Sequence, residues 1–212
     1  MSNIKLNDLF LPLAIIIAGG VIGVSVYLKG PTAPDTTNQP ETNYQLEKMS
    51  PVSDQEALRG NIKAPVKMVV YSDLECPACK FLHLELKKLE EKYVNSGKLA
   101  IAFRHFPLDS LHQKSRREAV ATECIKELKG GQAYWTFLDG IFETTNSNDS
   151  LTDEQLFSLA NNLGVNQQTL EACLKLDKHQ QAVEKQVAEA MSIGAQGTPF
   201  IIVISPDGQQ LA

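Results

Sequence analysis

The stretch at residues 66–79 constrains the fold of this chain more than any other part of the sequence. Residues 66–71 form a short, almost continuously apolar run rich in β-formers, which is typical of a buried central strand. Residues 77–93 alternate apolar side chains with Lys and Glu at helical spacing, and a proline is tolerated in the first turn of such a helix. A second strand is predicted over residues 99–103. The result is a strand–helix–strand unit, which favours a parallel strand pair.

Helical periodicity dominates the next part of the sequence, from about residue 109 to about residue 194. Thr152 and Gln155 have the spacing of a capping box, which marks one helix start. A third strand is predicted over residues 200–204, and the turn residues at 205–208 suit a hairpin. The candidate helices are residues 115–129, 132–142, 153–162, 167–174 and 178–193. These elements predict an α/β fold with a helical insertion between the second and third strands.

The N-terminal region is predicted to be a membrane anchor followed by a spacer. Residues 9–28 carry no charge over 20 positions, the length of a helix that spans a bilayer core. The segment lacks the small-residue pattern of a cleavage site, which favours an uncleaved anchor over a signal peptide, and its glycines argue against a buried core helix. We therefore expect a cytoplasmic stub and transmembrane anchor at residues 1–29, a flexible linker at 30–50 and a folded domain at 51–212.

The charge of the chain indicates which classes of binding partner to expect. The formal net charge is -5, and basic residues form no cluster longer than the stretch at residues 114–117. Nucleic acid is therefore not an expected partner, although the membrane is one through the N-terminal helix. We expect neither a cofactor nor a metal.

The motif Cys76-Pro77-Ala78-Cys79 places two thiols where the first strand meets the helix. Free backbone N–H groups and the positive end of the helix dipole favour a thiolate at Cys76, which makes it the predicted nucleophile. The two-residue spacing lets Cys79 attack a mixed disulfide formed at Cys76. The motif by itself is also half of a zinc site, and that alternative stays open at this point.

Cys124 and Cys173 lie on two of the predicted helices. Four cysteines in a chain with an export-type N-terminus suggest that these two form a structural disulfide. The alternatives are two separate buried thiols or a four-cysteine zinc site, and gaps of more than 40 residues between the cysteine pairs disfavour the zinc site.

Residues 71–79, Tyr-Ser-Asp-Leu-Glu-Cys-Pro-Ala-Cys, resemble the active site of DsbA-like thioredoxin-fold proteins. Thr198 and Pro199 precede the third strand, where that family has a cis-proline loop, and the helical block stands where its inserted domain does. The resemblance covers residues 60 to 208 and implies a thioredoxin-like fold, dithiol chemistry and protein substrates. It also implies a cis bond at Pro199 beside the Cys76 sulfur, with the backbone of Thr198 pairing with an extended substrate.

Three departures from the family pattern affect what to expect. Val70 stands where many relatives carry a buried carboxylate. Asp73 or Glu75 would have to take the role of that carboxylate, and neither lies in the interior of the predicted strand. Ala78 stands where DsbA has a histidine, so we expect a less oxidising couple. Four residues follow the last turn, so the usual C-terminal strand and helix are expected to be truncated.

The resemblance implies a thiol–disulfide oxidoreductase that introduces disulfides into cysteine-containing exported proteins through Cys76 and Cys79. A membrane redox partner would reoxidise it. Disulfides persist outside the cytoplasm, so the domain is expected on the extracytoplasmic side of the cell membrane, held by a single-pass anchor. The alternatives are a disulfide isomerase or reductase, suggested by Thr198, and a non-catalytic tethered binding or chaperone module.

The four histidines, His83, His105, His112 and His179, are predicted to be surface or structural residues. His83 lies one turn beyond Cys79 and is expected to face solvent.

Overall fold

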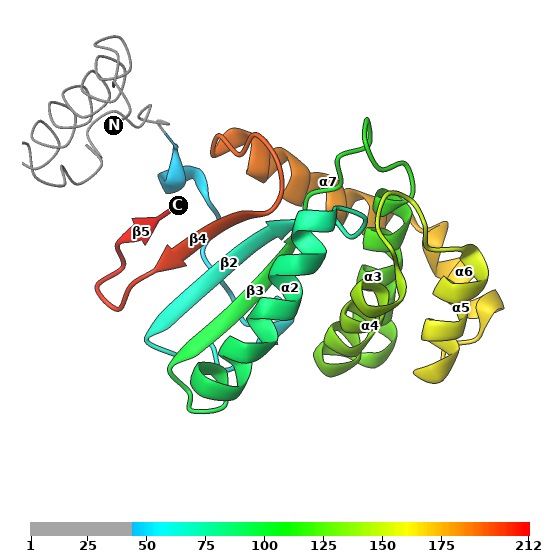
Figure 1. Ribbon diagram of the computed structural model, residues 1–212, viewed down its shortest axis with the longest axis horizontal. Coiled ribbons are helices and arrows are strands. Elements are labelled where there is room, and N and C mark those ends of the chain that lie inside the picture. Colours follow the sequence, from blue (N-terminus) through cyan, green and yellow to red (C-terminus); the bar gives the residue numbers. More distant parts are fainter. Residues whose placement is uncertain (1–43) are drawn as a thin grey trace, which may run out of the picture. The chain divides into compact units, whose positions relative to one another are not determined.

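The computed structural model describes residues 44–212 (Figure 1). The predicted anchor at residues 1–29 and most of the predicted linker lie outside the described residues. Within residues 44–212, we find no helix that combines the length and the apolar character needed to cross a bilayer.

The folded unit begins earlier than the predicted boundary at residue 51. The 3-10 helix η2 (Leu46–Lys48) precedes Met49, whose side chain is buried. The ring of Tyr44 packs edge-on against Phe200 with centroids 5.0 Å apart, and Gln45 N–H donates to the Ile193 carbonyl. These contacts could not be predicted from the sequence, because their partners lie about 150 residues away and the segment has no apolar periodicity of its own.

The described residues form one mixed sheet with the strand order β1-β3-β2-β4-β5. The central pair β2 and β3 is parallel, as predicted, and the other neighbours are antiparallel. Val70 pairs with Phe103 on one side and with Ile201 on the other, which places β2 in the middle of the sheet. The strands are β1 (Leu58–Arg59), β2 (Val66–Ser72), β3 (Leu99–His105), β4 (Phe200–Ile204) and β5 (Gln210–Leu211).

The short strand β5 closes a hairpin with β4, as the turn residues predicted. Leu211 pairs with Val203 and Gln210 with Ile204, and Ser205 N–H donates to the Gln209 carbonyl across the turn. The residues after the turn therefore join the sheet as a two-residue strand.

The helices confirm the predicted insertion between the second and third core strands. In Figure 1 helix α2 crosses one face of the sheet, and the helices α3 to α6 gather beside it. Helix α7 leads from this group back to β4 and contacts both α3 and β3. The helices are α2 (Pro77–Leu89), which continues as the π-helix η3 (Glu90–Val94), then α3 (Ser115–Lys129), α4 (Gly131–Thr144), α5 (Asp153–Asn162), α6 (Gln167–Leu174) and α7 (Asp177–Ser192).

A buried arginine joins the sheet to the insert. Arg104 on β3 donates to Glu56, to the Tyr71 hydroxyl and to Glu189 on α7, with N···O distances of 2.6 to 3.0 Å. The guanidinium side chain is only 5% exposed, and its donors find two carboxylates and a hydroxyl. These contacts connect β3 with α7 and with the segment that carries Glu56.

Candidate active site

The two cysteines of the Cys-x-x-Cys motif stand at the start of α2. Cys76 is the N-cap residue and has an extended backbone, and Pro77 occupies the first turn, where its missing N–H costs no hydrogen bond. Both cysteines are free thiols, and both are buried, Cys76 at 8% and Cys79 at 1% exposure. Cys76 is thus the sulfur that an incoming group reaches first.

The loop before β4 lies against the Cys76 sulfur. The peptide bond between Thr198 and Pro199 is cis, as the resemblance implied. The Cys76 Sγ lies 3.7 Å from the Thr198 carbonyl oxygen, close enough for a weak S–H···O contact. This proximity follows from the sheet, because antiparallel pairing sets Phe200 of β4 opposite Tyr71 of β2. The fold therefore brings Cys76, Thr198 and Pro199 together across more than 120 residues.

The surroundings split the acidities of the two thiols. A hydrogen bond from the Cys79 thiol lowers the pKa of Cys76 to about 5; burial opposes this, and the backbone N–H groups at the helix start support it. The same hydrogen bond, followed by burial, raises the pKa of Cys79, and the Ser72 hydroxyl only partly offsets that rise. At neutral pH the pair therefore consists of a thiolate at Cys76 and a thiol at Cys79.

Asp73 stabilises the turn that carries Cys76 through hydrogen bonds. Its fully buried carboxylate accepts hydrogen bonds from the backbone N–H groups of Glu75 and Leu108, at 2.8 and 2.7 Å. It also pairs with Nδ1 of His112 at 3.0 Å. Burial lowers the pKa of His112, but Asp73 and the nearby Cys76 raise it above the usual value. The raised pKa favours the protonated form of His112 beside Asp73 and near Cys76, a placement that the sequence did not indicate.

Two further buried carboxyl groups, those of Glu75 and Glu118, lie near the same turn. Glu75 is fully buried and accepts from Thr145 Oγ1 at 2.8 Å and from the Leu151 N–H at 3.1 Å. Burial, and then the charge of Glu75, raises the pKa of Glu118 on α3 to about 9. Glu118 thus holds a proton at neutral pH. The sequence suggested Glu75 as a candidate carboxylate, whereas Glu118 looked like any other acidic residue on a helix surface.

The expectation that His83 faces solvent is wrong. His83 is 3% exposed, its Nε2 lies 2.7 Å from Asp139 Oδ1, and its ring stacks on Phe142 at 4.5 Å. Cys79, His83 and Leu86 share the buried stripe of α2, because residues four and seven positions apart lie on one helix face. His105, His112 and His179 are buried as well.

Cys124 and Cys173 form a disulfide that joins α3 to α6, with Cα atoms 6.0 Å apart. The four cysteines therefore stand as two separate pairs, one free and one bonded, and do not form the four-cysteine zinc site considered above.

Comparisons with known proteins agree with this geometry. A family model described as "Thioredoxin" matches residues 53–208. "Probable disulfide bond formation protein D" from Bacillus anthracis is 28% identical over 162 residues, which are 71% of this chain and 70% of that protein. The crystal structure of Pseudomonas aeruginosa DsbA2 matches 77% of this chain and 86% of that chain, with 25% identity and a TM-score of 0.65. Oxidised BdbD from Bacillus subtilis shares the fold, at 21% identity and a TM-score of 0.64 over 80% of this chain and 86% of that chain.

Proposed function

The chain belongs to the thioredoxin family and is a DsbA-like thiol–disulfide oxidoreductase, and from this premise we propose that it introduces disulfide bonds into exported proteins through Cys76 and Cys79. The observation that carries the proposal is the asymmetry of the two sulfurs. Cys76 is the less buried thiol, has the lowered pKa and stands beside the Thr198 carbonyl, whereas Cys79 lies deeper and keeps its proton. A stabilised thiolate favours the reduced form, which makes the disulfide form a better oxidant.

The proposed reaction begins with the Cys76–Cys79 disulfide. A substrate thiolate attacks Cys76 Sγ, the Cys76–Cys79 bond breaks, and Cys79 leaves and takes up a proton, as its raised pKa requires. A second substrate thiolate then attacks the substrate sulfur of the mixed disulfide and releases Cys76 as a stable thiolate. The substrate gains a disulfide, and the enzyme gains two electrons and a proton.

Substrate recognition is proposed to use the loop at Thr198 and Pro199, next to the reacting sulfur. The backbone of Thr198 would pair with an extended substrate segment, so that its cysteine reaches Cys76. Phe81, in the first turns of α2, is 68% exposed and offers apolar contact area on the same helix as the two thiols. Recognition through backbone pairing would suit unfolded chains of varied sequence.

The cellular setting is a proposal as well. We place the domain outside the cytoplasm, tethered to the cell membrane by the uncharged segment at residues 9–28, because exported proteins acquire disulfides there. A membrane redox partner would accept the two electrons from the reduced pair and restore the disulfide.

The decisive experiment mixes the oxidised full-length protein with a reduced, unfolded protein that has several cysteines. We expect stoichiometric loss of substrate thiols and no transfer by Cys76→Ser. Reduced Cys79→Ser, mixed instead with a substrate that contains a disulfide, should trap a mixed disulfide at Cys76, because its thiolate attacks the substrate disulfide and no second thiol resolves the product. The control is the double variant Cys124→Ser and Cys173→Ser, which should transfer disulfides normally at temperatures where it is folded. Transfer by Cys76→Ser at the wild-type rate would refute the proposal, and unchanged cellular activity of Cys76→Ser would favour the binding or chaperone alternative.

A disulfide isomerase or reductase is the second candidate, and Thr198 before Pro199 is the feature that favours it. Refolding of a substrate with scrambled disulfides, under anaerobic conditions and with the enzyme in its reduced form, separates the two activities. An isomerase restores the native pairing catalytically, whereas an oxidase in its reduced form leaves the scrambled protein unchanged.

A further inference from the structure

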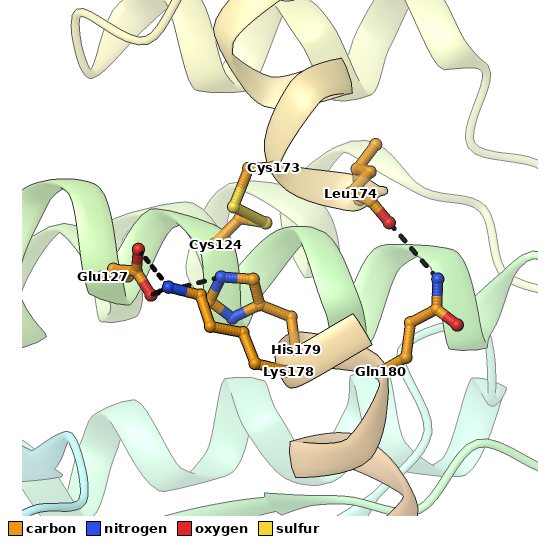
Figure 2. Close-up of a disulfide and its surroundings, with 7 residues drawn as sticks. All are labelled: Cys124, Glu127, Cys173, Leu174, Lys178, His179 and Gln180. Atoms are coloured by element: carbon orange, nitrogen blue, oxygen red, sulfur yellow. Dashed lines mark hydrogen bonds and ion pairs between the residues drawn. A yellow bond between two sulfur atoms is a disulfide. The ribbon is translucent and has the colours of Figure 1, made fainter. Parts of the chain in front are cut away.

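Three potential metal ligands meet at the second cysteine pair. The Sγ atoms of Cys124 and Cys173 and a ring nitrogen of His179 all lie within 4.8 Å of one another, and all three residues are buried. Figure 2 shows the histidine ring directed toward the disulfide from the start of α7, while the cysteines come from α3 and α6. Side chains from three helices thus converge at one place.

His179 lacks the partners that a buried histidine usually has. Its side chain is 7% exposed, and Nε2 is buried with no hydrogen-bond partner among the described residues. Glu127 Oε2 lies 3.3 Å from Nε2 as an ion-pair contact, although not in hydrogen-bond geometry (Figure 2). A buried ring nitrogen that makes no hydrogen bond costs free energy, and packing alone does not explain its position.

We propose that reduction of the Cys124–Cys173 disulfide converts this place into a binding site for zinc or a similar divalent transition-metal ion. Two thiolates and an imidazole are the donors that such ions prefer, whereas magnesium and calcium select oxygen ligands. Glu127, 44% exposed and adjacent to His179, supplies a carboxylate that can complete a tetrahedral site. The disulfide form has no thiolates and does not bind the ion.

The redox step requires a reductant, and a protein dithiol of the same compartment is the chemical class that supplies it. Two electrons and two protons pass from that dithiol, which becomes a disulfide, to Cys124 and Cys173, whose S–S bond breaks. Metal binding then displaces both thiol protons and forms two metal–sulfur bonds. The bound ion keeps the pair reduced, and its loss allows the disulfide to reform when an oxidant is present.

The test is a Co²⁺ titration of the full-length protein, because cobalt takes the tetrahedral geometry of zinc and absorbs visible light when thiolates bind it. Cys76→Ser and Cys79→Ser are introduced first, so that the catalytic pair cannot bind the ion. The protein is reduced with a phosphine, the reductant is removed without air, and Co²⁺ is added to the reduced and the oxidised forms in parallel. Zn²⁺ competition then gives the zinc affinity.

Reduced protein is expected to show thiolate-to-cobalt charge-transfer absorption that saturates with the added ion, and oxidised protein to show none. His179→Ala should weaken Co²⁺ binding by about tenfold or more and change the spectrum, since it removes a ligand. Gln180→Ala is the matched control: Gln180 is the next residue on α7, and its amide donates to the Leu174 carbonyl away from the site (Figure 2).

Two results would overturn the proposal. The first is a reduced protein, folded or unfolded, that gives no charge-transfer absorption. The second is a His179→Ala variant that binds Co²⁺ with the same affinity and spectrum as its parent, because two cysteines alone would then account for the binding. A variant with Cys124→Ser and Cys173→Ser must bind nothing in either case.

Discussion

At the scale of single residues, the chemistry depends on how two identical side chains come to differ. Cys76 stands at the N-terminus of a helix, where the Cys79 thiol and the backbone lower its pKa, whereas Cys79 lies one turn further into the core. The nearby histidine is His112, which pairs with Asp73 and has a raised pKa, and it lies outside the dipeptide between the cysteines. The surroundings of each thiol therefore decide that Cys76 is the nucleophile, because the two residues are of the same type.

The first prediction concerns the Cys76 thiol. Alkylation of the reduced protein should follow a thiolate that titrates near pH 5, well below the roughly 8.5 of a free cysteine. Rates of iodoacetamide modification across pH, read by mass spectrometry, give the midpoint, and Cys79 in the folded protein should stay unmodified. A midpoint near that of free cysteine would contradict the geometry described above.

The second prediction concerns Glu118. Its pKa is about 9 in the folded state against 4.5 for an ordinary glutamate, so the folded state holds the proton more tightly. This contribution to stability is complete below the unfolded pKa and is lost as pH rises toward the folded pKa. Glu118→Gln cannot titrate, so its free energy of unfolding should fall less steeply than that of the wild type across this window.

Urea unfolding at several pH values measures this difference. The gap between Glu118→Gln and the wild type should grow by at most about 1.4 kcal/mol per pH unit in favour of the variant. Glu143→Gln, an exposed glutamate on α4, is the control and should leave the pH dependence unchanged. Parallel curves for Glu118→Gln and the wild type would show that Glu118 is ionised in the folded protein.

At the scale of elements, long-range polar contacts fix how the strands, helices and loops meet. Asp73 follows β2 and bonds to the loop after β3, Arg104 on β3 reaches α7, and the disulfide joins α3 to α6. Each contact connects segments between 35 and 85 residues apart. The position of Cys76 therefore depends on elements that lie far from it in the sequence.

The third prediction is that Asp73→Ala is strongly destabilising. The substitution leaves the backbone N–H groups of Glu75 and Leu108 and the buried His112 without their acceptor, a loss of about 3–5 kcal/mol in the free energy of unfolding. Urea unfolding at neutral pH measures it. Asp109→Ala removes an exposed carboxylate that pairs with Arg116, and it should cost less than about 1 kcal/mol. Equal effects of the two variants would argue against the bracing role of Asp73.

The fourth prediction concerns the α3–α6 disulfide. Replacing both Cys124 and Cys173 by serine frees a segment with a sequence separation of 49 residues in the unfolded chain. The free energy of unfolding should fall by about 2–4 kcal/mol, measured by urea unfolding under oxidising conditions. The same loss is expected on reducing the wild-type disulfide in the absence of metal ions. An unchanged unfolding midpoint would show that the bond contributes no net stability.

At the scale of the whole molecule, the redox potential of the Cys76–Cys79 pair depends on all the groups that stabilise or destabilise the Cys76 thiolate. The helix start and His112 favour the Cys76 thiolate, but Val70 and Ala78 leave out two polar groups that relatives use. The fifth prediction is a Cys76–Cys79 potential more negative than the roughly -120 mV of DsbA, measured by equilibration with glutathione. His112→Ala should shift it to still more negative values, because the same attraction that raises the pKa of His112 near Cys76 favours the Cys76 thiolate. A potential at or above that of DsbA would contradict the prediction.

The local pattern of the sequence determined much of this protein by itself. Three features could be predicted because they depend on neighbours within a few residues. They are the apolar strand before Cys76, the amphipathic helix that carries Cys79 and the periodic helices of the insert. The Thr152 capping box formed as its spacing predicted. The pairing of Cys124 with Cys173 was likewise expected, because four cysteines in a chain with an export-type N-terminus suggest a structural disulfide.

Only the tertiary structure decided which polar groups meet. His112 reaches Asp73 across 39 residues, Glu118 on α3 meets Glu75 before α2, and His179 turns toward a disulfide between two other helices. The burial of His83 belongs to the same class, because α4 packs on a helix face that the sequence left open to solvent. Periodicity tells which face of an element is buried only where that face is apolar, and it carries no signal for the buried polar contacts that tune this site.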